Sequence, residues 1–230
     1  MNATFDSAQH AATLLTQGQY AAALEYLNGT TGHRFTALYR RDGDRAWNVV
    51  LFDRTSPLAP QFPEVGADET YCSIAMRDCQ VFVVRDSLAD PYLATHPARE
   101  VVRSYCGTPL MDANGEPFGT LCHFDFEPVE PSAAAAELLR QRSTLMNPQS
   151  MDAALHADVA RRMHNLESML PLLAASSEGQ ASREDGFDFM AEPVHALLPR
   201  LPADAAMQVR ERIEALAHRY AALCALPDTA

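Results

Sequence analysis

Residues 104–125, SYCGTPLMDANGEPFGTLCHFD, have the pattern of two strands joined by a tight turn. A three-residue loop over 113–115, with Gly115 in the left-handed conformation, is one of the common hairpin connections. This loop sets a register in which Cys106 lies directly opposite Cys122, with both thiols reduced. A two-residue Asn-Gly turn would shift the pairing by one residue and mix the two faces.

The two faces of this hairpin differ in character, because successive side chains of a strand point to opposite faces. In the three-residue register one face is small and apolar, and its two cysteines pack as small hydrophobic side chains. A directly opposed cysteine pair can also oxidise, so a redox role stays open. The other face gathers Arg103, Tyr105, His123 and Asp125 at one end of the hairpin. These four residues form either the floor of a pocket or a surface cluster of little energetic value.

The hydrophobic pattern before residue 130 predicts a mixed arrangement of helices and strands. Apolar residues at helical spacing give way to alternating patterns, and Gly and Pro separate the segments. The expected elements are a helix (7–28), two strands (34–40 and 46–52), a loop (53–68), a short helix (69–76), a strand (81–84), a loop (88–96) and the start of a helix (97–103).

From residue 131 onward every expected element is helical. Apolar residues recur at helical spacing through 151–173, and two further helices are expected near 187–198 and 203–224. The polar sequence near 174–186 predicts a linker. The chain therefore divides into a mixed domain, 1–130, and a helical extension, 131–230.

Composition excludes several classes of protein. The chain has 230 residues and a net charge of −12, and every basic residue is arginine. Such a chain, without a basic stripe, is a poor partner for nucleic acid. No apolar run approaches the roughly 20 residues that cross a bilayer. The first residues lack the features of a signal peptide, so we expect a cytoplasmic protein with five reduced cysteines. None of the cysteines forms a CxxC pair, which argues against a structural zinc site.

A longer stretch resembles a known family. The sequence ETYCSIAMRDCQVFVVRDSLADPYLATHPAREVVRSYCGTPLMDANGEPFGTLCHFDFEP, residues 69–128, follows a helix and a strand pair and precedes another helix. With its CGTPL strand and its FGTLCHFD return strand, the region from about 10 to 145 is similar to a GAF domain. The resemblance implies an α/β (α+β) fold in which helices cover one face of an antiparallel sheet. Loops roof a small-molecule pocket on the other face, and here an all-helical region follows.

The resemblance also implies a site. It places the polar face of the hairpin at the pocket floor, where Arg103, Tyr105, His123 and Asp125 suit a small polar or anionic effector. Asp125 would orient the Arg103 guanidinium when the site is empty. The other residues expected around the effector are Cys72, Asp90, Tyr92 and His96 from the segments above the floor, with Tyr39 or Phe35 as an aromatic wall. No catalytic residue, metal or particular cofactor is indicated, and the identity of the effector stays open.

Alternatives to a small-molecule sensor exist within the same family. One branch reduces free methionine sulfoxide with a thiolate and a resolving thiol; Cys72 matches one of them, but no cysteine lies between 80 and 105. The same gap disfavours a covalently attached bilin. A non-haem iron sensor of the nitric-oxide-responsive type would use Asp90 and Asp125, with Tyr105 in place of its thiolate. A fourth possibility is a dimerisation module without a ligand.

The helical extension suggests partners. The segment DVARRMHNLESMLPLL, 158–173, faintly resembles the dimerisation helix of a histidine-kinase class, but Ala160-Arg161 stands where the phosphoacceptor histidine is expected. Kinase activity is therefore not indicated. We expect the apolar stripes of these helices to pack in a homodimer and to relay a signal to a protein partner.

Overall fold

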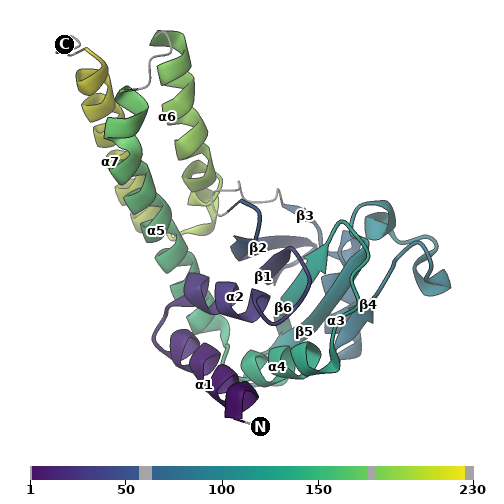
Figure 1. Cartoon of the computed structure of the whole chain (residues 1–230). Helices are drawn as coiled ribbons and strands as arrows, with labels where there is room; N and C mark the ends of the chain where they lie inside the picture. Colours follow the sequence, from purple (N-terminus) through teal and green to yellow (C-terminus); the bar gives the residue numbers. More distant parts are fainter. Residues whose placement is uncertain (1, 57–63, 176–179, 226–230) are drawn as a thin grey trace. The chain divides into compact units, whose positions relative to one another are not determined.

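The computed structural model describes residues 2–56, 64–175 and 180–225, which form two compact units, Met1–Leu155 and His156–Ala230 (Figure 1). The first unit contains a six-stranded sheet in the order β3-β2-β1-β6-β5-β4, and every neighbouring pair with a described register is antiparallel. Its strands are β1 (Phe35–Asp42), β2 (Arg45–Asp53), β3 (Val65–Gly66), β4 (Phe82–Val84), β5 (Ser104–Met111) and β6 (Pro117–Asp125).

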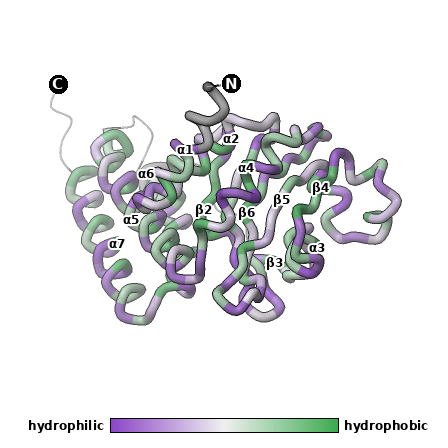
Figure 2. Tube along the Cα trace, turned by 90° about the horizontal axis from the view of Figure 1, so that it is seen from below, coloured by the Kyte–Doolittle hydropathy of each residue, from purple (hydrophilic) through white to green (hydrophobic). Residues whose placement is uncertain are grey.

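Helices cover both faces of this sheet. Figure 2 shows α1 (Asn2–Thr16), α2 (Tyr20–Asn28) and α4 (Ala133–Ser143) on one side of the strands and α3 (Tyr71–Asp78) on the other. Three short 3₁₀ segments flank α3 in the sequence. The first, η1 (Ala67–Glu69), precedes α3, and η2 (Pro91–Leu93) and η3 (Pro97–Glu100) follow β4. The arrangement confirms the α+β fold that the sequence predicts.

The expected first helix, 7–28, is two helices in the structure. Gly18, between α1 and α2, has φ +73°, a left-handed conformation that other residues rarely adopt. The backbone N–H of Gln19 donates to Leu14 O, so the turn around Gly18 closes the end of α1. Apolar residues recur at helical spacing in both α1 and α2, because each helix packs its apolar face on the core. The spacing alone therefore does not reveal where one helix ends and the next begins.

The turn of the β5–β6 hairpin has the predicted geometry. Gly115 has φ +82°, and the backbone N–H of Asp112 donates to Glu116 O at 2.9 Å. The Asp112 carboxylate also accepts from the backbone N–H of Asn114 at 2.8 Å and of Glu116 at 2.9 Å. The three-residue loop is therefore confirmed.

The predicted pairing of Cys106 with Cys122 is wrong. Met111 pairs with Pro117, but Leu110 pairs with Gly119, so Phe118 is an extra residue in β6. Beyond this bulge the register shifts by one, and Cys106 lies opposite His123. Proline cannot donate to a strand ladder and is commonly found at such irregularities.

The bulge decides which face each side chain of β6 occupies, since a one-residue shift moves every side chain across the sheet. Tyr105 now pairs with Phe124, and Gly107 pairs with Cys122, on the face that packs against α3. Cys106 and His123 share the opposite face, toward α1, α2 and α4. The four polar residues predicted to share a floor are therefore divided between the two faces.

The first unit extends further than the predicted boundary near residue 130. Helix α4 packs on β5 and β6, and its Ala135 and Leu139 are buried. The second unit holds α6 (Gln180–His195) and α7 (Ala203–Cys224), with η4 (Leu198–Arg200) between them, while α5 (Pro148–Ala174) begins in the first unit and continues into the second. Part of the predicted 174–186 linker is helical from Gln180, and residues 176–179 lie outside the described residues. Among the residues described, no helix is long and apolar enough to span a membrane.

Candidate functional site

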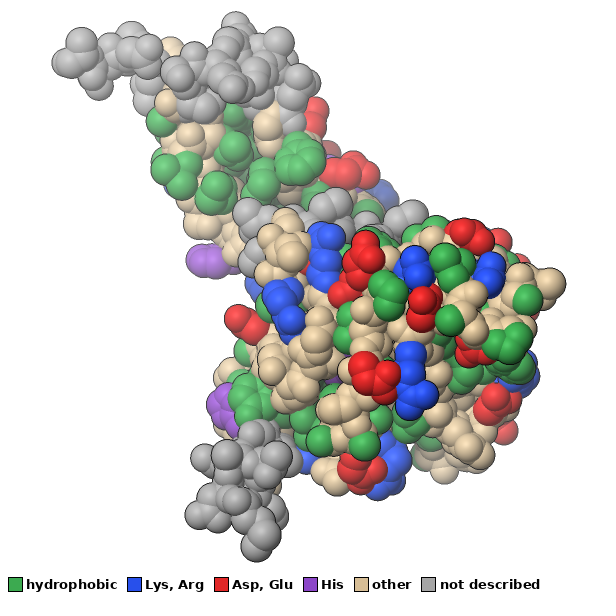
Figure 3. Space-filling model, turned by 45° about the vertical axis from the view of Figure 1, so that its right-hand side comes forward, with side chains coloured by type: hydrophobic (Ala, Val, Ile, Leu, Met, Phe, Trp, Pro, Cys, Tyr) green, Lys and Arg blue, Asp and Glu red, His purple; other side chains and the backbone are tan. Residues whose placement is uncertain are grey.

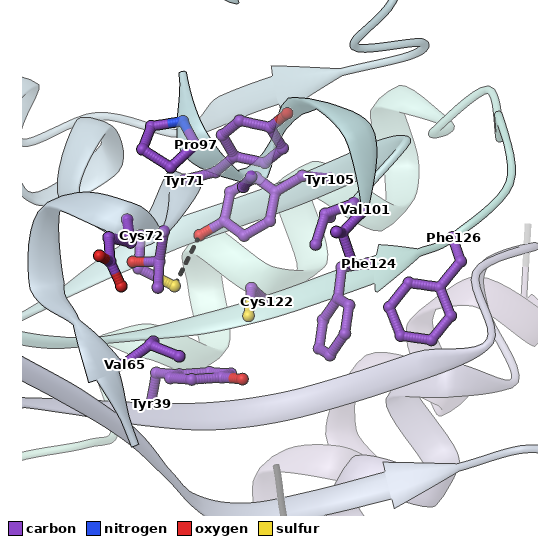
Figure 4. Close-up of a pocket in the computed structure, with 14 residues that line it drawn as sticks. Tyr39, Val65, Tyr71, Cys72, Pro97, Val101, Tyr105, Cys122, Phe124 and Phe126 are labelled. Atoms are coloured by element: carbon purple, nitrogen blue, oxygen red, sulfur yellow. Dashed lines mark hydrogen bonds between the residues drawn. The ribbon is translucent and has the colours of Figure 1, made fainter. Parts of the chain in front are cut away.

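A cavity of about 360 Å³ lies between the sheet and the segments that cover its α3 face (Figure 4). Five aromatic side chains line it: Tyr39 of β1, Tyr71 of α3, Tyr105 of β5, Phe124 of β6, and Phe126 just after β6. Aliphatic side chains complete most of the wall: Val65, Pro97, Ala98, Val101 and Val102. The volume and the apolar lining are typical of pockets that hold small organic molecules.

The aromatic rings hold one another in place. Tyr105 packs edge-to-face on Tyr71 with ring centroids 5.8 Å apart, and Tyr39 does the same on Phe124 at 6.4 Å. Phe124 also stacks on Phe35 of β1 at 4.8 Å. Such contacts stabilise ring orientation beyond simple burial, so these walls are preformed.

Gly107 makes room for the Tyr105 ring. The two residues are two apart in β5 and share the pocket face, and a Cβ added to Gly107 would lie 2.1 Å from Tyr105 Oη. The ring therefore lies along its own strand over Gly107. This arrangement directs the phenol oxygen toward α3, where Tyr105 Oη donates to Cys72 Sγ at 3.5 Å.

Cys72 occupies the first turn of α3, and its sulfur faces the cavity (Figure 4). Thr120 Oγ1 of β6 donates to the same sulfur at 3.0 Å. A hydrogen bond from Cys122 and then bonds from the hydroxyls of Thr120, Tyr105 and Thr70 lower the pKa of Cys72 to about 7, although burial opposes this shift.

The pKa values of the neighbouring thiol and phenol groups are raised rather than lowered. Burial raises the pKa of Cys122 well above its ordinary value and does the same for Tyr39 and Tyr105, and nearby thiols add to each shift. All three therefore stay protonated near neutral pH. The pocket holds one acidic sulfur among neutral hydrogen-bond donors and aromatic walls.

The structure brings three of the predicted site residues, Tyr39, Cys72 and Tyr105, to this cavity. The other three residues of the predicted floor, Arg103, His123 and Asp125, do not line the cavity. His123 is fully buried on the opposite face, and Arg103 forms an ion pair with Asp86 through Nε at 3.0 Å and Nη2 at 2.8 Å. The predicted pairing of the Arg103 guanidinium with Asp125 is therefore wrong.

Asp125 ties two segments of the fold together. Its carboxylate accepts from the backbone N–H of Arg34 at 2.7 Å and from that of Glu127 at 3.1 Å. Arg103 meets Asp125 only through the backbone, where its N–H donates to Asp125 O at 2.9 Å. Neither side chain is among those that line the cavity.

Buried His123 belongs to a polar network on the helix face. Thr36 Oγ1 accepts from Asn28 Nδ2 at 2.9 Å and lies 2.7 Å from His123 Nδ1. The Thr36 hydroxyl and His123 Nδ1 therefore share a hydrogen bond. His33 stacks on His123 with ring centroids 5.9 Å apart. Burial lowers the pKa of His123 to about 3 and that of His33 to about 4, so both rings are neutral.

Asp90, Tyr92 and His96 lie in the segment before η3 and do not line the aromatic cavity, although the His96 ring packs on Tyr71 with centroids 4.7 Å apart. Asp90 caps η2 by accepting from the backbone N–H of Tyr92 at 2.9 Å, and Tyr92 is 60% exposed. Tyr92 and His96 line a second hollow of about 580 Å³ with Arg41 and Arg77. Its lining is more polar, and Arg77 is already paired with Asp78.

The predicted iron ligands are not brought together. The Asp90 carboxylate caps η2, the Asp125 carboxylate holds backbone groups, and the Tyr105 hydroxyl bonds to Cys72. Over 2–56, 64–175 and 180–225, no group of three or more His, Cys, Asp or Glu side chains is placed to hold a metal ion.

Sequence reasoning missed Tyr71, Cys122, Phe124 and Phe126 as lining residues. Two of them, Cys122 and Phe124, would have been assigned to the face of Tyr105 by the register that a two-residue turn implies. The sequence signal for the bulge was the pair Pro117 and Gly119 on either side of Phe118. Gly119 is needed because a Cβ there would come 2.3 Å from Tyr39 O of β1. That contact requires glycine where β6 pairs with the end of β1 beside Tyr39.

Comparison with known proteins agrees with this geometry. The family profile of the GAF domain matches residues 5–147, so the chain belongs to the GAF domain family. None of the curated proteins compared with the chain matches it.

Solved structures share the fold at low sequence identity. The GAF domain of an Acinetobacter phosphoenolpyruvate-protein phosphotransferase is 14% identical, with a TM-score of 0.53 over 69% of this chain and 96% of that chain. A free methionine-R-sulfoxide reductase from Neisseria meningitidis, solved with its substrate, is 18% identical, with a TM-score of 0.50 over 67% and 91%. A putative GAF sensor protein from Burkholderia vietnamiensis is 17% identical, with a TM-score of 0.50 over 64% and 95%.

Proposed function

We propose that the first unit is a sensory domain whose pocket binds a small, neutral and largely apolar molecule. The observation that carries this proposal is the 360 Å³ cavity with five aromatic side chains in its lining. Glu69 is the only Asp, Glu, Lys, Arg or His among the described lining residues, and one oxygen of its carboxylate, Oε2, accepts from the backbone N–H of Gly66 at 3.0 Å. Aromatic faces favour planar apolar ligands, and the Tyr39 and Tyr105 hydroxyls suit one polar end.

This ligand class differs from the polar or anionic effector that the sequence predicts. That expectation depended on Arg103 as an anchor, and the Arg103 side chain pairs with Asp86 outside the lining. An anion in the cavity would meet Tyr and Phe faces, which carry negative charge, and would lose its hydration without a cation to replace it. A neutral molecule loses much less on entry.

The test compares two probes with the same ring system, one neutral and one anionic: 2-naphthalenemethanol and 2-naphthoate. Thermal unfolding of the full chain should shift upward with the alcohol, because a ligand that binds only the folded state stabilises it. The carboxylate should produce little shift. Ala98→Phe, which fills the cavity from η3, should abolish the response to the alcohol, and the control Ala94→Phe, on an exposed position nearby, should keep it. A stronger response to the carboxylate, or one lost in Arg103→Ala, would contradict the proposal.

We infer that the domain does not reduce methionine sulfoxide, although one structural neighbour is a free methionine-R-sulfoxide reductase. That likeness concerns the fold alone. Residues 80–105 contain no cysteine, and the second thiol of the pocket is Cys122, on β6. With dithiothreitol as reductant, the protein should leave free methionine sulfoxide unchanged. Turnover that Cys72→Ser abolishes would assign the enzyme instead.

We further propose that the C-terminal helices relay the signal through a homodimer in the cytoplasm, with a signalling protein as partner and without nucleic acid or membrane. Figure 3 shows hydrophobic side chains gathered on one face of the second unit. Large apolar residues are exposed on its helices: Leu172 (65%), Phe189 (68%) and Met207 (56%). On the drawn face of the first unit, arginine and acidic side chains are interspersed, which does not favour a polyanion.

The assembly is tested by sedimentation velocity at tens of micromolar protein. We expect a dimer for the wild type and a shift toward monomer for Phe189→Glu, because burying a new charge in an apolar contact is unfavourable. Val83→Glu, on an exposed apolar residue of the first unit, serves as the control and should remain dimeric. A monomeric wild type would contradict the relay through a dimer.

A further inference from the structure

The thiol of Cys72 lies among hydrogen-bond donors as well as packing groups. Its sulfur receives hydrogen bonds from Thr120 Oγ1 at 3.0 Å and Tyr105 Oη at 3.5 Å, two donors from different strands that converge on one atom. Donors aimed at a sulfur stabilise its thiolate form. Cys72 is also the second residue of the eight-residue helix α3, where the helix dipole favours negative charge.

A second thiol lies beside it. Cys122 lies two residues after Thr120 on the same face of β6, and Thr120 Oγ1 contacts Cys72 Sγ, so the two cysteines line the same part of the cavity. The Cys122 thiol donates to Ala37 O at 3.8 Å. Burial raises the pKa of Cys122, whereas that of Cys72 is lowered, so Cys72 is the more acidic thiol of the two. Both cysteines are free in the structure. This is the division of roles that a nucleophilic thiol and a resolving thiol require.

Access to the pair is through the aromatic cavity. Cys72 and Cys122 both line it, while each is almost fully buried from bulk water. In Figure 4 the two sulfur atoms lie between the Tyr105 ring and the Tyr39 ring. A reagent must therefore enter a space with aromatic walls before it can meet either sulfur, and this favours a molecule with an apolar body.

We propose that Cys72 and Cys122 form a redox-sensitive pair that an organic hydroperoxide oxidises inside the pocket. The Cys72 thiolate attacks the distal oxygen of the hydroperoxide, and the O–O bond breaks. The departing alkoxide takes a proton and leaves as an alcohol, and Cys72 becomes a sulfenic acid. The Cys122 sulfur then attacks the Cys72 sulfur, the S–S bond forms, and the hydroxyl leaves with the Cys122 proton as water. Two thiols are oxidised, and one hydroperoxide is reduced to an alcohol and water.

The disulfide would change the pocket that the proposed function uses. It would join the first turn of α3 to the middle of β6 and oxidise the sulfur that Tyr105 and Thr120 now contact. The oxidation of Cys72 and Cys122 takes place in the same cavity that the proposed ligand occupies, but it does not require that a neutral probe binds there. The two proposals can therefore fail separately: probe binding is measured on the reduced protein, and thiol chemistry on the same protein without the probe.

The test uses the full chain with Cys79→Ser and Cys224→Ser, which removes the exposed and the partly exposed cysteine. Cumene hydroperoxide should produce a Cys72–Cys122 disulfide, identified by peptide mass spectrometry and reversed by dithiothreitol. Addition of Cys122→Ser should stop the reaction at a Cys72 sulfenic acid that dimedone labels. Cys106→Ser is the matched control, because Cys106 is buried on the other face of the sheet and burial raises its pKa to about 11. It should react as the parent does.

Two further measurements make the result decisive. Tyr105→Phe removes one donor and should slow oxidation about ten-fold, in line with the loss of a hydrogen bond to a charged group. At equal concentration, cumene hydroperoxide should oxidise the pair faster than hydrogen peroxide does. Failure of the folded parent to form the disulfide, equal dimedone labelling of Cys106, or faster reaction with hydrogen peroxide would overturn the proposal. Circular dichroism of each variant confirms that the compared proteins are folded.

Discussion

Single residues decide what the pocket of this GAF domain offers to a ligand. Tyr105 is the clearest case, because its ring forms a wall and its hydroxyl reaches Cys72. That position depends on Gly107, whose missing side chain leaves the space that the phenol group occupies. A glycine in a strand usually weakens it, and here the packing of a neighbouring aromatic explains why glycine is present.

Gly107→Ala should therefore displace the Tyr105 ring and lower the free energy of unfolding by about 1–3 kcal/mol, as overpacking does. The hydrogen bond to Cys72 should be lost at the same time. In a Tyr105→Ala background the same glycine substitution should have almost no effect, because the ring that it strikes is gone. A double-mutant cycle by chemical denaturation measures this coupling. Additive effects of the two substitutions would show that Gly107 acts elsewhere.

The buried histidines on the other face predict a pH dependence. Burial lowers the pKa of His33 to about 4 and that of His123 to about 3; Asp125 partly offsets the first shift, while His33 and then Arg54 add to the second. The unfolded chain binds protons on both rings below pH 6.5, but the folded protein does not. The contribution of the two histidines to stability is therefore constant well above this pH and decreases as the pH falls toward 4, by up to about 1.4 kcal/mol per pH unit for each histidine.

The measurement is guanidinium unfolding between pH 7.5 and 5, above the range in which most carboxylates titrate. His123→Asn keeps a hydrogen-bonding group beside the Thr36 hydroxyl and removes one titrating group. The slope of unfolding free energy against pH should therefore be about half that of the wild type. Substitution of the exposed His218 provides a control that should leave the slope unchanged. A wild-type protein whose stability does not change across this interval would contradict the assigned neutral states.

At the scale of elements, the β5–β6 hairpin shows how far the sequence could predict the structure. The turn could be predicted, because Gly115 and the Asp112 carboxylate specify it locally. The bulge at Phe118 could not, because it depends on the close approach of Gly119 to Tyr39 in a strand that is distant in sequence. Because side chains alternate strictly along a strand, this one-residue error applied to the whole of β6 beyond Phe118. The fold was predicted correctly, but half of the candidate floor was assigned to the wrong face of the sheet.

The turn itself can be tested. Gly115→Ala places a side chain on a residue with φ +82° and should reduce stability by about 1–2 kcal/mol. Gly115→Asn should lose less, since asparagine tolerates the left-handed region better. A Cβ at this position would contact nothing within 4 Å, so crowding cannot explain a difference. Equal stability of all three proteins by thermal unfolding would show that the turn does not require glycine.

At the scale of the whole molecule, the chain combines a pocket-bearing GAF unit with a helical unit, and α5 contributes to both. The six-stranded sheet separates the two kinds of chemistry in the first unit. Its helix face buries the neutral histidine network, and its α3 face holds the aromatic cavity with the Cys72 and Cys122 thiols. A ligand that enters the cavity contacts β1, β5, β6 and the α3 region together, so occupancy can affect the packing of the entire sheet.

The central claim is that the aromatic cavity, and not the polar hollow beside Tyr92 and His96, is the ligand site. A crystal structure of the reduced full chain with 2-naphthalenemethanol tests this most directly. We predict density for the naphthalene rings among Tyr39, Tyr105 and Phe124, with the hydroxyl near a tyrosine oxygen. Density in the hollow beside Tyr92 and His96, with the aromatic cavity filled by its own side chains, would contradict the account.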